Sequence, residues 1–251
     1  MATQSIIVKH PKEFLSYLNS ILKIVPSCKF IINQNGCTVR AAQESGTVKA
    51  FFELSTVLSE EPIEFCLLDV QKLSKAISLI VEYDSEADKG IEIKYDKGKV
   101  HYTKQGLSFK FTTVREDTVE RYITNPLKRE LTGSFGMKIN NKIISRVNSL
   151  AGISSSEKPK LYLSCADDII SAEVDDKTNA ISDMAGIPIA KADKIIGDWT
   201  QSVCLNLDTF RLYGAIDSED IEVCMTERGV MLVNSTSDNI KMKLVSTVLK
   251  G

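Results

Sequence analysis

The sequence predicts an α+β protein in which one β-rich fold occurs twice in tandem. Asp69–Ile77 and Asp208–Ile216 share Asp, Leu, Ala and Ile in register, and an apolar run containing a Cys precedes each of them. A repeat of about 125 residues has the size of a small domain and is too long for a solenoid unit. We therefore expect one domain over residues 1–115, a connector over residues 116–132 and a second domain over residues 133–251.

In the first half, two short helices interrupt a series of strands. Ser5–His10 alternates between apolar and polar residues, as a strand does, and Pro11 suits the first turn of a helix with apolar residues at helical spacing. Asn35-Gly36 is a hairpin-turn signal, and Asp69 is typical of an N-cap before the second helix. The other expected strands are Cys28–Gln34, Thr38–Glu44, Thr47–Leu54, Ile63–Leu68, Ile91–Tyr95, Val100–Lys104 and Leu107–Val114.

The second half repeats this order. Apolar spacing over Asn140–Leu150 predicts its first helix, and Asp208 is expected to cap the second. The charged residues 116–132 between the halves contain Pro126 and break the alternation, as an inter-domain connector does. The expected strands are Ser134–Ile139, Leu161–Ala166, Ile169–Asp175, Ala180–Ala190, Ser202–Leu207, Ile221–Met225, Val230–Asn234 and Ile240–Val248.

The composition is that of an ordinary globular protein with enough apolar residues for two cores. Hydrophobic residues make up 43% of the chain and charged residues 25%. The six cysteines form no CxxC motif, which favours buried, reduced thiols over disulfides. No apolar stretch approaches the roughly 20 residues of a membrane span, and the N-terminal residues do not resemble a signal peptide. We therefore expect a soluble protein inside the cell, without a membrane partner.

The chain offers no set of residues suited to catalysis. His10 and His101 are its two histidines and lie in separate elements, and no GxSxG, P-loop, GxGxxG or HExxH motif occurs. The acidic doublets Asp167-Asp168 and Asp175-Asp176 lie where strands end, and turn chemistry explains them better than a metal ion does. The sequence therefore predicts that the protein is not an enzyme and has no metal and no cofactor.

Positive charge is concentrated in the expected helices. Their windows, residues 11–24, 70–80, 140–151 and 208–216, carry seven basic and two acidic residues, or +5 in a chain of net charge −2. Exposed helix positions are often Lys or Arg, but four such helices in an otherwise acidic chain favour one surface for a polyanion. Ser and Asn lie between them and no aromatic ladder does, which suits duplex phosphates rather than stacked bases. The residues expected to face DNA are Lys12, Lys23, Lys72, Lys75, Lys142, Arg146 and Arg211.

The duplication, the element order, the connector and the basic helices together resemble the DNA sliding clamps of the proliferating-cell-nuclear-antigen and T-even-phage type. Leu163–Asp167 resembles a strand and turn of the eukaryotic clamp, and Thr38–Ser45 resembles its equivalent in the first domain. The resemblance spans the whole chain. It implies a DNA polymerase processivity factor that encircles duplex DNA as a ring, is served by a clamp loader and tethers polymerase and other replication proteins. Such a protein works at replication sites, in the nucleus or, if viral or prokaryotic, in the cytoplasm.

The resemblance also implies a head-to-tail homotrimer and a docking pocket for partner peptides. Subunits would pair through edge strands at Leu107–Arg115 and about Ala180–Ala190, with Phe109, Phe111, Thr113, Ala185, Ile187 and Ile189 at the interface. Partner peptides of the family insert an apolar plug beneath the connector, and the matching residues are Ala42, Thr47, Tyr122, Ile123, Leu127, Leu244 and Val248. Leu244–Val248 lacks a proline that the eukaryotic clamp has there, so we expect a different partner motif.

Two alternatives stay open at this point. A monomeric viral processivity factor of the same fold would hold DNA by charge alone, and it calls for a larger, one-sided positive charge. A ring-forming structural protein could also use a duplicated β-rich fold, but it would have no reason to place lysines on the helices of both repeats. The mass of the protein in solution separates the monomer from a ring.

Overall fold

The computed structural model describes residues 3–104, 106–125, 135–154, 160–175, 183–195, 202–226 and 229–249. The chain divides into two units. Unit 1 comprises Met1–Pro126 and Asp238–Met242, and unit 2 comprises Leu127–Ser237 and Lys243–Gly251. The division after Pro126 lies inside the connector expected over residues 116–132, whereas Asp238–Met242, which the sequence placed in the second domain, belongs to unit 1.

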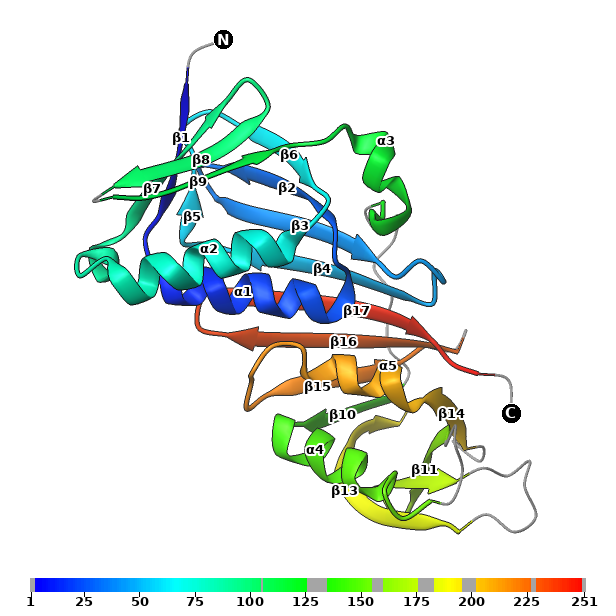
Figure 1. Ribbon diagram of the computed structural model, residues 1–251. Helices are drawn as coiled ribbons and strands as arrows, with labels where there is room; N and C mark the ends of the chain where they lie inside the picture. The colour runs from blue at the N-terminus through cyan, green and yellow to red at the C-terminus, as the bar shows by residue number, and fades with distance from the viewer. Residues whose placement is uncertain are drawn as a thin grey trace. The chain divides into compact units, whose positions relative to one another are not determined.

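Unit 1 contains two antiparallel groups of strands and a pair of helices (Figure 1). The strand orders are β5-β1-β7-β8-β9 and β4-β3-β2-β6. Strands β1 to β9 are Gln4–Val8, Cys28–Asn33, Gly36–Ala42, Val48–Leu54, Val57–Leu58, Ile63–Leu67, Ile91–Asp96, Lys99–Lys104 and Leu107–Thr112. Helices α1, α2 and α3 are Pro11–Ile24, Val70–Tyr83 and Glu116–Val119, and the 3-10 turns η1 and η2 are Ala87–Lys89 and Glu120–Tyr122.

The β2–β3 hairpin sets the register between these two strands. Asn33 pairs with Gly36, so the tight turn consists of Gln34 and Asn35, one residue before the predicted Asn35-Gly36, and Gly36 is already the first residue of β3. Gly36 has φ of +142°, and a Cβ at this position would lie 2.7 Å from the carbonyl oxygen of Leu54. Only glycine meets both conditions, which explains why a glycine follows the turn.

Helices α1 and α2 pack side by side (Figure 1). Helix α1 has the predicted bounds, with Pro11 in its first turn. Asp69 caps α2 as predicted, because its side chain accepts a 3.3 Å hydrogen bond from the backbone N–H of Lys72. Ser74 Oγ lies 2.7 Å from Asn19 Oδ1 and donates a hydrogen bond to it, so a polar contact joins the two helices. Both helices bury an apolar stripe and keep the other side for solvent.

Unit 2 repeats the order of unit 1: a strand, a helix, further strands, a second helix and three strands. The strand order is β14-β11-β12-β13-β10-β15-β16-β17. Strands β10 to β17 are Phe135–Ile139, Lys160–Ala166, Ile169–Asp175, Ala185–Ile195, Val203–Asn206, Ile221–Met225, Val230–Ser237 and Ile240–Thr247, of which β17 begins in the segment counted with unit 1. Helices α4 and α5 are Asn141–Leu150 and Leu207–Arg211, and the 3-10 turn η3 is Leu212–Gly214.

The second helix of unit 2 corrects a sequence expectation. Asn206, rather than Asp208, is the N-cap, because its side chain accepts a 2.8 Å hydrogen bond from the backbone N–H of Asp208. Asp208 lies in the first turn, where a carboxylate complements the helix dipole. The 3-10 turn Leu212–Gly214 then ends the α-helix at Arg211. The α-helix expected over residues 208–216 therefore begins at Leu207 and ends at Arg211.

Other differences lie at element ends. The connector, expected to be irregular, begins with α3 and η2, and α2 continues past Ile80 to Tyr83. The strand expected over Ala180–Ala190 is β13, which runs from Ala185 to Ile195, whereas residues 180–182 lie outside the described residues. Strand β5 was not expected, because a strand of two residues is too short to show an alternation of apolar and polar side chains.

Candidate nucleic-acid interface

All seven basic residues expected to face DNA are exposed. In unit 1, Lys12 and Lys23 lie on α1, and Lys72 and Lys75 lie on α2. Because the two helices lie side by side, these four lysines belong to one helical layer (Figure 1). The helical period that placed them off the apolar stripes therefore predicted their exposure correctly.

Ion pairs make the charge of this layer uneven. Lys12 Nζ lies 3.0 Å from a carboxylate oxygen of Asp88, which follows α2, so the beginning of α1 lies near the end of α2. Lys72 Nζ lies 3.8 Å from Asp69 at the other end. Both pairs are exposed and hold their lysines weakly. Among the described residues, no carboxylate forms an ion pair with Lys75.

In unit 2, Lys142 and Arg146 lie on α4, and Arg211 lies on α5. Arg211 Nε donates a 3.3 Å hydrogen bond to Asn148 Oδ1, and its guanidinium pairs with Asp208 at 2.5 Å. Arg211 thus joins α5 to α4. Within the described part of unit 2, neither Lys142 nor Arg146 forms an ion pair, so both cations remain available to an anionic ligand.

Neutral polar residues lie between the basic ones, with one exception. Helical spacing places Ser20 beside the basic residues, off the apolar stripe, but Ser20 is buried, and its hydroxyl donates a 2.9 Å hydrogen bond to the carbonyl oxygen of Ser16. This i−4 bond lets a serine occupy an inward helix position. The exposed polar residues are Ser16, Asn19, Gln71, Ser145 and Ser149.

The connector lies against the strands of unit 1. Ile123 forms an isolated antiparallel bridge with Ala41 on β3, and Val119 is fully buried. The guanidinium of Arg121 lies over the ring of Tyr122, 4.8 Å from its centroid, and pairs with Glu44 at 3.0 Å. Tyr122 and Ile123 are half-buried and keep part of their apolar surface accessible.

The residues of the expected peptide pocket are distributed over both units. Ala42, Thr47, Tyr122 and Ile123 belong to unit 1, where the bridge at Ala41 brings the connector next to the end of β3. Leu244 is fully buried and Val248 half-buried, and both belong to unit 2. Leu127 lies outside the described residues.

Strand β9 ends its sheet order and pairs with β8. Phe109 stacks on Tyr102 with centroids 5.7 Å apart and on Phe111 at 5.0 Å, and both phenylalanines are only half-buried. Thr113 follows the strand and donates a hydrogen bond to the carbonyl oxygen of Gly98. The expected first interface segment is therefore a strand edge with partly exposed aromatic rings.

Strand β13 carries the second expected interface segment and pairs unevenly along its length. Its Ala185–Lys191 part pairs with β12, while only Ala192–Ile195 pairs with β10. Ala185, Ile187 and Ile189 therefore lie where a described strand is present on one side only. Ile189 is buried, and Ala185 and Ile187 are half-buried.

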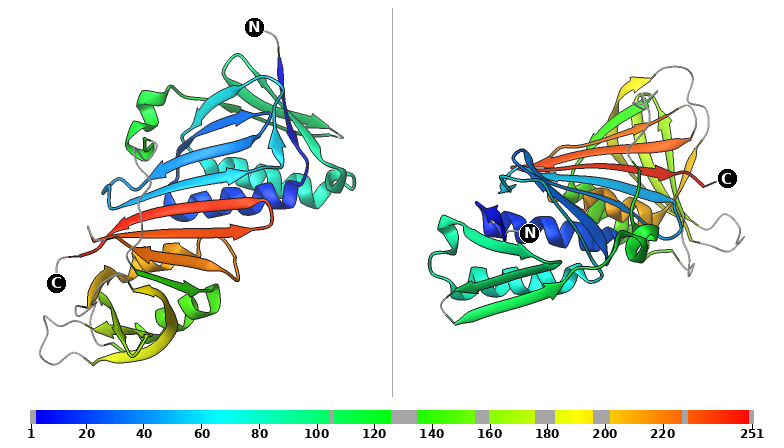
Figure 2. Two further views of the ribbon diagram at one scale, coloured as in Figure 1. Left: turned by 180° about the vertical axis from the view of Figure 1, so that it is seen from behind. Right: turned by 90° about the horizontal axis from the view of Figure 1, so that it is seen from above.

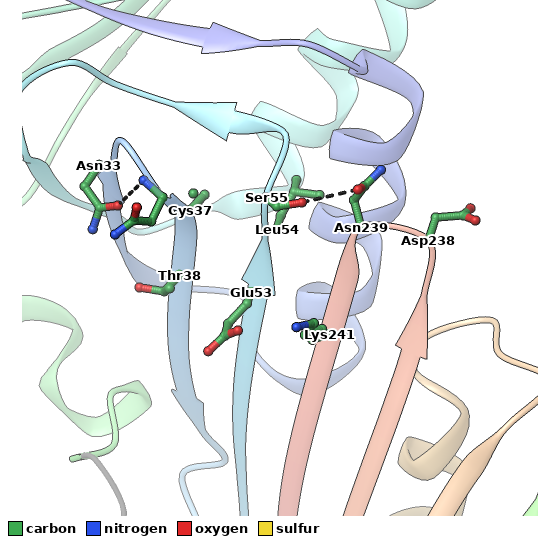
Figure 3. Close-up of a pocket in the computed structure, with 11 residues that line it drawn as sticks. Asn33, Cys37, Thr38, Glu53, Leu54, Ser55, Asp238, Asn239 and Lys241 are labelled. Carbon is green, nitrogen blue, oxygen red and sulfur yellow. Dashed lines mark hydrogen bonds between the residues drawn. The ribbon is translucent and has the colours of Figure 1, made fainter.

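An open pocket of about 450 Å³ lies in unit 1 beside the β2–β3 turn, the end of β4 and Asp238–Lys241 (Figure 3). Its polar groups bond largely to one another. Asn33 Oδ1 accepts a 2.8 Å bond from the backbone N–H of Asn35, and Ser55 Oγ lies 3.3 Å from Asn239 Oδ1. The pocket lies between the β2–β3 turn and the neighbouring strands, and the residues that line it include no catalytic set.

The titratable groups are structural in character. Burial raises the pKa of the Cys28 thiol and raises that of Cys37 to about 12, so both thiols are unreactive. The turn residues Asp167 and Asp168 have φ of 48° and 60°, as a tight hairpin requires.

Among the described residues, no group of His, Cys, Asp and Glu could hold a metal ion. Within the same residues, no helix is long and apolar enough to cross a membrane.

Two ion-pair networks escaped sequence reasoning. Lys29 on β2 lies 2.7 Å from both Glu64 on β6 and Glu116 at the start of α3. Asp84, after α2, accepts hydrogen bonds from Tyr102 at 3.1 Å and Lys104 at 3.0 Å. Both networks join a residue of a strand to a residue at the end of a helix far away in sequence, and no local pattern signals them.

The fold is that of the PCNA-type sliding clamps. The chain matches the Proliferating Cellular Nuclear Antigen of Entamoeba histolytica with a TM-score of 0.75 and 9% sequence identity over 100% of both chains. It matches the PCNA of A. fulgidus, in a structure with the C-terminal region of FEN-1 bound, with a TM-score of 0.74 and 9% identity over 99% of both chains. No family model matches the sequence, and no curated protein is similar to it in sequence. The predicted α+β clamp fold is confirmed.

Proposed function

We propose that this protein is a sliding clamp, a processivity factor that encircles duplex DNA as a ring and tethers DNA polymerase and other replication proteins. The observation that carries the proposal is the set of exposed basic side chains on both helices of each unit, in a chain of net charge −2. A fold shared with PCNA over the whole chain supports the same function. The protein then acts by binding and holding, as a scaffold without chemistry of its own.

The helix surfaces suit loose binding that ignores base sequence. Lys75, Lys142 and Arg146 have no ion-pair partner among the described residues, so phosphates can pair with them. Lysine and serine side chains contact phosphate oxygens without reading base edges. Binding of this kind arises from counterion release and leaves the duplex free to move along the surface.

The strand edges support closure of the ring by three chains. An edge strand with unpaired backbone groups and half-buried rings requires cover, and β9 is such a strand. Pairing of β9 with the Ala185–Lys191 part of β13 in the next chain would be heterologous, and such contacts form a ring when the rotation closes. Three chains of two units each give the six-unit ring that the resemblance implies.

The proposed docking site for partners is the connector face, by which we mean Tyr122, Ile123 and the adjacent end of β3. The partners include the polymerase and a clamp loader at replication sites in the cell. The structure of the A. fulgidus protein has the C-terminal region of FEN-1 bound, which supports a peptide-binding role for this fold. Replacing Tyr122 and Ile123 by Ala should weaken polymerase-peptide binding by about 2 kcal/mol or more, as apolar anchors do in small interfaces. Unchanged affinity in a folded variant would place the site elsewhere.

Three measurements test the ring. Light scattering should give the mass of three chains, and electron micrographs should show a ring with a central hole. After mixing with circular plasmid and chemical cross-linking, part of the protein should resist high salt and then be released when the plasmid is cut once. A monomer mass at every concentration, with binding that salt abolishes on circular and linear DNA alike, would refute the ring and favour the monomeric processivity factor.

A further inference from the structure

The beginning of the connector is held by Lys29, which lies on β2, the strand next to the edge strand β6. Lys29 Nζ lies 2.7 Å from the Glu116 carboxylate, which begins α3, and 2.7 Å from Glu64. The Lys29 side chain is only 18% exposed, whereas the two carboxylates are more than half exposed. One cation thus serves two carboxylates, one from the sheet and one from the connector.

Backbone pairing shows how this contact arises. Lys29 on β2 is opposite Cys66 on β6, and the backbone N–H of Val114 donates a 3.0 Å hydrogen bond to the carbonyl oxygen of Cys66. The chain therefore leaves β9 by touching the edge of β6, and Glu116 then reaches back across β6 to β2. Val119, three residues further along, is fully buried.

The far end of the connector is held differently. Ile123 bridges Ala41 through the backbone, while the Arg121–Glu44 pair has both side chains more than 60% exposed. Exposed pairs of this kind contribute little. The pair of Lys29 with Glu116 is different, because the lysine side chain is largely shielded from solvent and its attraction to the carboxylate is therefore screened less by salt. The hydrogen bonds that Lys29 donates to the carboxylates of Glu116 and Glu64 raise the pKa of Lys29, which agrees with a cation held firmly in place.

We propose that Lys29 is the positioning residue of the connector face: by holding Glu116 it sets where α3 begins, and hence where Tyr122 and Ile123 meet the apolar anchor of a partner peptide. This inference rests on the proposed docking function of the connector. Lys29 itself lies on β2, is not one of the docking residues, and acts through the connector.

Hydrogen exchange of the connector tests the anchoring without any partner. The amides of Thr118 and Ile123 bond to Arg115 and Glu120 within the connector and report its order. Lys29→Met and Glu116→Gln should each speed their exchange at least tenfold, and the double variant should add nothing further. Lys29→Arg should restore slow exchange. Lys49→Met, which removes an exposed lysine from β4, is the matched control and should exchange like the parent.

Peptide binding tests the positioning. The probe is a peptide selected from a displayed random library for binding to the parent protein and loss of binding to Tyr122→Ala. Lys29→Met should weaken its affinity at least tenfold, and Lys29→Arg should recover most of it. Unchanged exchange in Lys29→Met overturns the anchoring, and faster exchange with unchanged peptide affinity overturns the positioning role. If no Tyr122-dependent peptide emerges, the docking function fails together with the positioning role, while the exchange result still stands by itself.

Discussion

Removing four exposed basic side chains from the helices should weaken DNA binding and flatten its salt dependence. The variant replaces Lys72, Lys75, Lys142 and Arg146 by Ala, and each of these positions is exposed, so the fold should persist. Each phosphate contact contributes about −0.9 to the slope of log K against log salt concentration. Because Asp69 already holds Lys72 at 3.8 Å, we count on about three full contacts and a slope that is smaller by about 3.

Fluorescence anisotropy with a short labelled duplex measures this slope directly. Between about 50 and 200 mM salt, a slope difference of about 3 changes the affinity ratio of parent and variant by roughly 60-fold. The parent should therefore bind much better than the variant at low salt and lose most of this advantage at high salt. Duplexes of different sequence should give the same values, because phosphate contacts carry no base information.

A variant of equal charge change separates the helix surface from net charge. Lys49, Lys97, Lys138 and Lys241 are exposed lysines outside the helices, and their replacement by Ala also removes four positive charges. This control should keep a slope close to that of the parent. If both variants flatten the slope equally, or if the helix variant keeps the parental slope, the helices do not form the DNA-binding surface.

Three further predictions concern stability. Tyr213→Phe should lower the free energy of unfolding by about 1 to 2 kcal/mol in urea titrations, because its buried hydroxyl lies 2.9 Å from the buried Ser246 Oγ; an unchanged midpoint would contradict this. Ser235→Ala should keep or raise stability by up to about 1 kcal/mol, because the buried Ser235 hydroxyl has no hydrogen-bond partner in the described part of the chain; a clear loss in the same titration would show a hidden partner. The backbone N–H of Glu86 and the Lys104 ammonium hold the pKa of Asp84 below its ordinary value. Its contribution is therefore present above the ordinary pKa and lost as the pH falls through the lowered one, so thermal midpoints of Asp84→Asn should fall less steeply in acid than those of the parent, and equal slopes would refute the role of this carboxylate.

Local signals predicted much of the fold. Pro11 and the apolar spacing that follows it predicted the bounds of α1, and Asn35-Gly36 predicted the β2–β3 turn to within one residue, because both features depend on residues close in sequence. The cap of α5 could not be chosen locally. Asn206 and Asp208 are both good capping residues. Strand β14 ends at Asn206, so the helix begins directly after it and Asn206 becomes the N-cap.

The candidate site was predictable only as far as helical period reaches. The exposure of the basic residues follows from their place on a helix. The same reasoning places Ser20 wrongly, because its hydroxyl bonds to the carbonyl oxygen of Ser16 and the serine can therefore be buried. The pairing of Lys29 with Glu116 joins residues 87 positions apart, and that of Lys12 with Asp88 joins two separate elements. Such contacts depend on strand register and helix packing, which no local pattern contains.

The burial of the cysteines allows the opening of unit 1 to be followed by itself. Cys28, Cys37 and Cys66 are buried in unit 1, whereas Cys165 and Cys224 of unit 2 are half exposed. Thiol reagents attack the thiolate, so accessible cysteines react first and buried ones wait for local unfolding. Mass spectrometry of peptides from briefly alkylated protein would therefore time the opening of unit 1 without any substitution in the chain, with the two more accessible cysteines of unit 2 as an internal reference.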